Sequence, residues 1–328
     1  MSPSKRRAPS SKPLEPAAAP RPEDASARSN RILDRLLSAL PEQHRARARD
    51  LLVLMRMDRP IGALLLLWPT WWALWLAARG WPSLKLFVVF TLGVFVMRSA
   101  GCAINDFADR KLDPRVQRTA GRPIAAGRVT PREALVVFGL LLLIAFGLVL
   151  LTNPLTVKLS LVGAALAALY PFSKRVTHLA QVVLGAAFGW SIPMAFAAVT
   201  GALPPLAWLL FLANVLFSVI YDTEYAMVDR ADDIRAGSKS TAILFGEDDL
   251  MILGVLVASF LLAMAFVGSR AGLAWPYWLA WLAAAIMLVR QLWSMRDRSR
   301  EHCFAAFRNN NWVGGVLWLG MLAGLAMA

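Results

Sequence analysis

The sequence predicts an all-α membrane protein in which about nine transmembrane helices, organised as two four-helix repeats plus one helix, surround a central cavity. Hydrophobic residues make up 58% of the 328-residue chain, which is more apolar side chain than a water-soluble globule buries. Only 17% of the residues are charged, and the chain has 13 tryptophans, a residue enriched at membrane–water interfaces. Long apolar runs also recur along the chain.

Windows of about 19 residues locate the apolar runs. They predict helices over 60–78, 84–104, 134–151, 155–171, 179–199, 205–220, 250–267, 275–292 and 312–327. The fourth run is short against the roughly 20 residues that a helical span requires.

The loops between these runs carry unequal charge. Basic residues gather in the second, fourth, sixth and eighth loops: Arg110, Lys111, Arg115, Arg118, Arg122, Arg128, Arg132, Lys174, Arg175, Arg230, Arg235, Lys239, Arg296, Arg298, Arg300 and Arg308. The odd loops contain only Arg79 and Arg270. Because basic loops stay in the cytoplasm, this alternation predicts a cytoplasmic N-terminus and, with nine spans, an external C-terminus.

The segment before the first span differs in composition. Residues 1–30 are rich in Pro, Ala, Ser and Arg, which predicts a disordered tail. No short apolar core follows the early basic residues, so a secretory signal is not expected, and three acids argue against an organellar transit peptide. Residues 31–59 alternate apolar and basic side chains, as in an interfacial helix, although a solvated linker is the alternative. The membrane domain is expected over 60–328.

Net charge and cysteine content exclude two classes of function. The net charge of +14 suggests nucleic acid, yet no basic segment carries interleaved aromatic residues or a nucleic-acid module, so no nucleic-acid partner is expected. Cys102 and Cys303 are far apart and lie in no CxxC or Cys/His cluster, which argues against a disulfide framework and a metal–thiolate site.

The first acidic motif is NDFADRKLD, residues 105–113, where the second apolar run ends. If the helix continues, Asn105, Asp109 and Asp113 share one face at i, i+4 and i+8, with Asp106 beside them. Clustered carboxylates repel one another. A Mg²⁺ ion relieves that repulsion, because it takes one or two carboxylates together with substrate phosphate oxygens.

A second acidic segment, YDTEYAMVDRADDIRAGSKST, follows the sixth run as the first motif follows the second. Asp222, Asp229 and Asp233 fall at i, i+7 and i+11, again one helical face. This correspondence suggests two four-helix repeats whose acidic ends face one cavity and hold a diphosphate through metal ions. Solvated loops are the plain alternative, but two matched clusters in an acid-poor chain favour the metal site.

Other polar residues have weaker assignments. Lys174 and Arg175 either clamp a diphosphate or carboxylate, or only mark a cytoplasmic loop. Arg56 has the same two readings. Arg98 lies inside the second span seven residues before Asn105, so a functional or paired role is expected, with snorkelling as the alternative. Tyr170 suits a cation-facing or an interfacial position, and Asn214 either lines the cavity or joins helices.

These motifs resemble those of a known family. NDFADRKLD and DRADD match the NDxxDxxxD and DxxxD motifs of the UbiA-type intramembrane aromatic prenyltransferases. Longer segments are similar to the branch of the family that prenylates 4-hydroxybenzoate in ubiquinone biosynthesis: MRMDRPIGALLLLWPTWWALW, RSAGCAINDFADRKLD, YPFSKRVTHLAQVVLGAAFGWSIPMAFAA, YDTEYAMVDRADD and GSKSTAILFG. The resemblance covers roughly 55–311.

The resemblance implies transfer of a polyprenyl group from polyprenyl diphosphate to position 3 of 4-hydroxybenzoate through an allylic carbocation, at the bacterial inner membrane or, alternatively, the mitochondrial inner membrane. The implied Mg²⁺ ligands are Asn105, Asp106, Asp109, Asp113, Asp229 and Asp233. Arg175 is the further catalytic candidate. The implied substrate-binding residues are Asn105, Arg56, Arg98, Lys174, Tyr170, Asp222 and Asn214.

Three alternatives stay open at this point. A family member with another acceptor would share the metal motifs. A cation-coupled secondary transporter also uses intramembrane carboxylates, although it places them near the bilayer midplane. A phospholipid-forming phosphotransferase would need a DGxxAR opening, which the sequence lacks.

Overall fold

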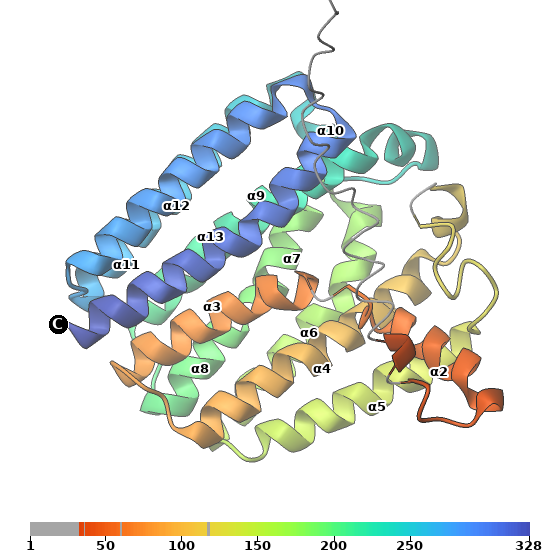
Figure 1. Ribbon diagram of the computed structural model, residues 1–328, viewed down its shortest axis with the longest axis horizontal. Coiled ribbons are helices and arrows are strands. Elements are labelled where there is room, and N and C mark those ends of the chain that lie inside the picture. The colour runs from red at the N-terminus through yellow and green to blue at the C-terminus, as the bar shows by residue number, and fades with distance from the viewer. Residues whose placement is uncertain (1–32, 36, 60, 117–118) are drawn as a thin grey trace, which may run out of the picture.

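The computed structural model describes residues 33–35, 37–59, 61–116 and 119–328, and within these ranges it contains helices and no β-strand (Figure 1). The predicted all-α class is therefore confirmed. The expectation for the tail, residues 1–30, concerns residues outside those ranges.

Within the described residues, each predicted apolar run coincides largely with one helix, except the fifth run, which spans two helices. The long helices are α3 (Ile61–Ala78), α4 (Leu84–Asp109), α5 (Pro131–Val149), α6 (Pro154–Val176), α7 (Ala180–Gly189), α8 (Ser191–Thr200), α9 (Pro205–Ala236), α11 (Asp249–Ala271), α12 (Trp275–Ser294) and α13 (Arg300–Ala326). Shorter elements are α2 (Glu42–Leu54), η1 (Asp113–Arg115), α10 (Thr241–Phe245), η2 (Gly246–Asp248) and η3 (Met295–Asp297).

Local sequence explains where several helices begin and break. Thr130 and Glu133 form a capping box at the start of α5, and the Asn153 side chain accepts the Thr156 N–H at the start of α6. The fifth predicted run is divided into α7 and α8 at Trp190. Pro193 has no N–H for the Gly189 carbonyl, which removes a helical hydrogen bond at that break.

The number of spans differs slightly from the prediction. Eight helical segments of the described chain are long and apolar enough to cross a membrane, judged by length and composition. The helix α13 falls outside this group. Its first half carries three consecutive asparagines, residues 309–311, and these lower its hydropathy. The all-helical membrane fold is therefore confirmed, whereas the count of nine is not.

Close packing joins the last helix to the first span. The Trp68 Nε1–H donates to Asn311 Oδ1 at 2.8 Å, and the Trp72 Nε1–H donates to the Gly314 carbonyl at 3.1 Å. A Cβ at Gly314 would lie 2.7 Å from the Trp68 ring, so glycine is required for this approach. The contact closes the helices into a ring around the interior.

A buried polar network ties three helices of the second half together. Glu224 on α9 is fully buried and accepts hydrogen bonds from Gln291 Nε2 on α12 and Asn310 Nδ2 on α13, each at 2.6 Å. Asn309 Nδ2 donates to Gln291 Oε1 at 2.7 Å. In an apolar surrounding such bonds satisfy groups that would otherwise stay unpaired, and so they fix how these helices face one another.

One end of the helical ring gathers the charged segments. In Figure 1 the connections after α4 and after α9 lie at the same end as α2, and the C-terminus lies at the opposite end. Leu54 of α2 packs with Ala103, Ile124 and Val129. Asp50 accepts from Arg128 Nε at 2.8 Å. Within residues 37–59 the structure therefore contains a helix, α2, that packs against α4 and the segment after it.

Packing between α11 and α12 gives a stability prediction. A Cβ at Gly268 would lie 2.1 Å from the buried ring of Tyr277, whereas one at Gly254, on the same helix, would meet nothing within 4 Å. Gly268→Leu should lower the free energy of unfolding by at least about 2 kcal/mol, the usual range for overpacking, and Gly254→Leu should not. Thermal unfolding in detergent measures both, and equal melting temperatures would contradict this packing.

Candidate active site

A large cavity of about 1000 Å³, lined by described residues, opens inside the helical ring. Its volume lies at the upper end of the range for small-molecule sites. One part of its wall is polar and comes from the ends of α4, α6 and α9 and from the turns beside them. Another part is apolar and includes Leu142 and Phe146 of α5 and Ala164 and Ala167 of α6. The cavity therefore suits a ligand with a charged head and an apolar tail.

The first acidic motif reaches the cavity from two elements. Asn105, Asp106 and Asp109 lie in the last turns of α4, and all three line the cavity. The helix ends at Asp109, and Asp113 begins the separate turn η1. Pro114 contributes to this end, because the residue before a proline is disfavoured in a helix. The predicted i, i+4, i+8 face is thus wrong for Asp113, although its side chain still lines the cavity.

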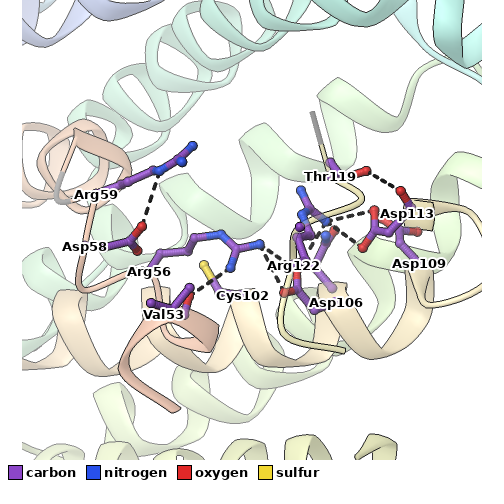
Figure 2. A network of polar contacts seen from close by, with 12 residues as sticks. Val53, Arg56, Asp58, Arg59, Cys102, Asp106, Asp109, Asp113, Thr119 and Arg122 are labelled. Atoms are coloured by element: carbon purple, nitrogen blue, oxygen red, sulfur yellow. Dashed lines mark hydrogen bonds and ion pairs between the residues drawn. The ribbon is translucent and has the colours of Figure 1, made fainter. Parts of the chain in front are cut away.

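Asp106 is the most deeply buried acid of this motif, with 1% of its surface exposed. Arg56 Nη2 donates to its two oxygens at 2.8 and 3.1 Å, and Arg122 Nη1 lies 3.2 Å from Oδ1. The same Arg122 group donates to both oxygens of Asp113 at 3.1 and 3.0 Å. Figure 2 shows this chain of alternating charges, in which two arginines partly neutralise Asp106 and Asp113.

Arg56 holds its position through an uncommon backbone conformation. Its φ angle is 57°, in the left-handed region that residues with a Cβ rarely adopt. Its Nη1 also donates to the Val53 carbonyl at 2.9 Å, so the guanidinium is fixed from both sides. Backbone strain of this kind costs of order 1–3 kcal/mol and is common at functional sites.

Lys174 comes from the last turn of α6 and faces the same motif. Its Nζ lies 3.5 Å from Asp109 Oδ2 and donates to Asn105 Oδ1 at 3.4 Å. The Tyr170 ring, one turn earlier, has its centroid 5.5 Å from Nζ. Both residues line the cavity, so the structure brings this part of the predicted site together.

The second acidic motif belongs entirely to α9. This helix continues for 32 residues, and Gly237, at φ 72°, ends it in a left-handed cap. Asp222, Asp229 and Asp233 all line the cavity, as their spacing on one helical face predicted. The two acidic segments, which are distant in sequence, therefore border the same cavity.

Two predicted site residues do not line this cavity. The Arg175 guanidinium donates to the Ala108 carbonyl of α4, because it leaves α6 in another direction from Lys174. Asn214 is buried against α7, where a Cβ at Gly189 would lie 2.6 Å from its Nδ2. The expectation that Asn214 lines the cavity is therefore wrong, and its alternative role at a helix contact agrees with this position.

Arg98 is placed as the sequence indicated. It lines the cavity from the middle of α4, and its Nη1 donates to Cys102 Sγ at 2.8 Å. A Cβ at Gly62 would lie 2.5 Å from its Nη2, so this glycine leaves room for the guanidinium beside α3. Within the described chain its Nε is buried and has no hydrogen-bond partner.

Several cavity residues were not identified from the sequence. Arg122 was only one of many loop cations, although the pairing of its charge with the first motif is central to the site. Asp58 and Tyr225 also line the cavity. The signal for Asp58 was its place in MRMDRP, a segment that also supplied Arg56. Arg122 is identified only by its contacts with Asp106 and Asp113 in the folded chain, because no local sequence pattern marks it.

The charge balance bears on whether a metal fits. Burial raises the pKa of the Asp113 carboxyl to about 6; Arg122 opposes the shift, and the nearby Asp109 and Asp106 add to it. Among the residues described, no group of three or more His, Cys, Asp or Glu side chains is arranged to hold a metal ion. Mg²⁺ typically binds one or two carboxylates and completes its shell with substrate phosphates and water, so the oxygen ligands of the two motifs suit such an ion.

Two solved structures have a similar fold. A UbiA homolog from Aeropyrum pernix superposes with a TM-score of 0.71 at 24% identity, covering 82% of this chain and 99% of its own. A UbiA homolog from Archaeoglobus fulgidus, bound to GPP and Mg²⁺, gives a TM-score of 0.63 at 16% identity, covering 84% and 99%. These two likenesses concern the fold.

Sequence relatives are much closer. A 4-hydroxybenzoate octaprenyltransferase of Alkalilimnicola ehrlichii is 58% identical over 86% of this chain and 96% of its own length. One of Xanthomonas campestris pv. campestris is 59% identical over 84% and 91%, and one of Providencia stuartii is 56% identical over 82% and 93%. The family model described as the UbiA prenyltransferase family matches residues 66–319. The chain, with its two acidic motifs on one cavity, belongs to the UbiA prenyltransferase family.

Proposed function

We propose that this protein transfers a polyprenyl group from polyprenyl diphosphate to position 3 of 4-hydroxybenzoate and releases diphosphate, in a Mg²⁺-dependent reaction of ubiquinone biosynthesis. The observation that carries the proposal is the cavity bordered by both acidic motifs and, elsewhere, by apolar residues of α5 and α6. The relatives named 4-hydroxybenzoate octaprenyltransferase support this acceptor over others of the family.

The oxygen ligands for Mg²⁺ come from the two motifs. Those of the first motif are Asn105, Asp106, Asp109 and Asp113, and those of the second are Asp229 and Asp233. When bound, the metal supplies positive charge that neutralises the diphosphate leaving group. Arg56 and Arg122 hold Asp106 and Asp113 in place until the diphosphate arrives.

The diphosphate binds beside Lys174. Its ammonium lies between Asn105 and Asp109, so it can shift a short way to a phosphate oxygen while staying in the same polar region. Arg175, which the sequence offered for this task, instead supports the end of α4 through the Ala108 carbonyl. It is a positioning residue in this proposal.

Departure of the diphosphate leaves an allylic carbocation on the first isoprene unit. The face of Tyr170 attracts this cation, and the apolar wall accommodates the prenyl chain. The same wall excludes water, which would otherwise capture the cation. The ring carbon ortho to the hydroxyl then attacks.

The acceptor needs a cation for its carboxylate. Arg98 meets this need, because it lines the cavity and its Nε is buried without a hydrogen-bond partner in the described chain. A bidentate arginine–carboxylate contact would complete the site and fix the ring. Asp222 also lines this cavity, and its side chain would restrict the orientation of the acceptor ring.

The protein crosses the membrane several times, and the basic loops support a location in a bacterial inner membrane with the N-terminus and the polar end of the cavity in the cytoplasm. The acidic motifs then meet soluble Mg²⁺ and 4-hydroxybenzoate, and the lipid phase supplies the prenyl donor.

Membranes that contain the protein should make 3-polyprenyl-4-hydroxybenzoate from 4-hydroxybenzoate and prenyl diphosphates of several lengths. Chelation of Mg²⁺ should abolish product, and added Mg²⁺ should restore it. Product is measured by chromatography of radiolabelled acceptor. Folded protein that prenylates no acceptor with any donor rules out the proposed function, and product with a different aromatic acceptor only would revise the substrate.

Asp109→Ala and Asp229→Ala, one in each motif, should each reduce turnover by at least about 100-fold, because each removes charge stabilisation from the transition state. Glu301→Ala, an exposed acid at the start of α13, is the matched control and should keep full activity. All three proteins should insert into membranes equally. Normal activity of either variant would show that its motif is not needed to bind the metal ion.

The raised pKa of Asp113 predicts a pH dependence. Below about pH 6 the carboxyl takes up a proton and loses the charge that a metal ligand needs, so kcat/KM should fall as the pH drops from 7 to 5. Saturating Mg²⁺ should move this fall to lower pH, since metal and proton compete for one carboxylate. A flat profile at limiting Mg²⁺ would contradict the role of Asp113.

A further inference from the structure

The turn between α2 and α3 carries an acid that the mechanism above does not use. Asp58 lines the cavity, and only 9% of its surface is exposed. It lies two residues after Arg56 and just before α3 begins, so the same turn supplies both a cation for Asp106 and a carboxylate. Figure 2 shows the Arg56 side chain extending from this turn toward Asp106, with Asp58 beside its base.

The two oxygens of Asp58 are in different situations. Arg59 Nε lies 3.3 Å from Oδ2, and the Arg59 side chain itself is 61% exposed. Oδ1 is buried and, within the described chain, has no hydrogen-bond partner. A buried carboxylate oxygen without a hydrogen-bond donor raises the free energy of the folded protein. We therefore expect a ligand in the cavity to supply the missing donor.

The other acids of this side of the cavity have cationic partners. Asp106 and Asp113 share Arg122, and Asp109 has Lys174. Asp58 forms an ion pair through one oxygen only, Oδ2. It lies just before α3, four residues before Gly62, and the Arg98 guanidinium packs against Gly62. The acid and the cation proposed for the acceptor carboxylate are therefore grouped at one end of α3.

We propose that Asp58 is the general base of the reaction, with Oδ1 accepting the proton that the aromatic ring loses. This inference rests on the proposed function. When ring carbon 3 bonds to the allylic carbon, the C–O bond to diphosphate has broken and its electron pair has left with the diphosphate. The C3–H bond then breaks, its electron pair restores aromaticity, and the proton passes to Oδ1, from which it later leaves to water.

Position and chemistry both suit this role. A general base has to lie within hydrogen-bond reach of the proton that it removes, and Asp58 lines the same cavity as Arg98. The negative charge also favours the cationic ring intermediate that forms just before proton loss. Arg59 holds Oδ2, which leaves Oδ1 as the oxygen without a partner in the described chain.

Asp58→Asn tests the proposal in full-length protein, with 4-hydroxybenzoate and with its 3,5-dideuterated form. Loss of the base should lower turnover by at least about 100-fold. It should also produce a primary deuterium isotope effect that wild-type protein lacks, because proton loss becomes rate-limiting. The KM for prenyl diphosphate should stay within about threefold, since the ion pair of Asp58 is with Arg59 and not with Arg56, Arg122 or Lys174, which hold the first motif.

Asp58→Glu keeps a carboxylate and should retain measurable turnover with an isotope effect, even where Asp58→Asn gives no product. Asp34→Asn is the matched control, because Asp34 is an exposed acid whose side chain is 52% accessible and pairs with Arg49. It should behave as wild type. Melting temperatures of all variants are compared in detergent.

The outcomes separate the two proposals. If wild-type protein forms no prenylated acceptor, the proposed function fails and this inference falls with it. If wild-type protein is active, three results overturn only the assignment of the base. The first is near-normal turnover of Asp58→Asn, and the second is reduced turnover of Asp58→Asn without an isotope effect. The third is inactivity of both Asp58→Asn and Asp58→Glu when both are folded.

Discussion

Neutralisation of the buried carboxylate of Asp106 is the interaction on which the site depends. A charge with 1% of its surface exposed is tolerated only when other charges and hydrogen bonds offset its lost hydration. Here two guanidinium groups do so, one from the turn before α3 and one from the connection after η1. Removal of one partner from such a buried pair typically costs about 3–5 kcal/mol, so this contact also holds the two segments to the end of α4.

The same arrangement serves binding. With the arginines in place, the acids of the first motif are partly neutralised. Such a balance would suit a metal ion that arrives with a diphosphate, because Mg²⁺ completes its shell with substrate phosphates and water. The second motif lies on one continuous helix, α9. The Glu224 network locks this helix against α12 and α13, so that it presents Asp222, Asp229 and Asp233 on a rigid support.

The helices were predictable because a bilayer leaves little choice. Inside the hydrocarbon every backbone N–H and C=O has to be paired within the segment, so a run of about 20 apolar residues forms a helix. In the described chain each predicted run coincides largely with helix, and the fifth run is broken at Trp190. The differences come from polar sequence within or beyond such runs: α4 stops at Asp109 instead of continuing through Asp113, and α13 is not among the helices apolar enough to count as candidate spans.

The sequence by itself determined the membrane class, the helical runs, the charge asymmetry of the loops and the two acidic motifs, because each of these is local or periodic. Most of the cavity-lining acids, Lys174 and Arg98 were recognisable in the same way. Only the tertiary structure decided that Arg122 balances Asp106 and Asp113, that Arg175 turns to the Ala108 carbonyl, and that Asn214 faces α7. It alone shows that Asp58 Oδ1 is buried without a hydrogen-bond partner in the described chain. The reason is physical: the direction of a side chain near a helix end and the partner of a buried charge depend on segments that are distant in sequence.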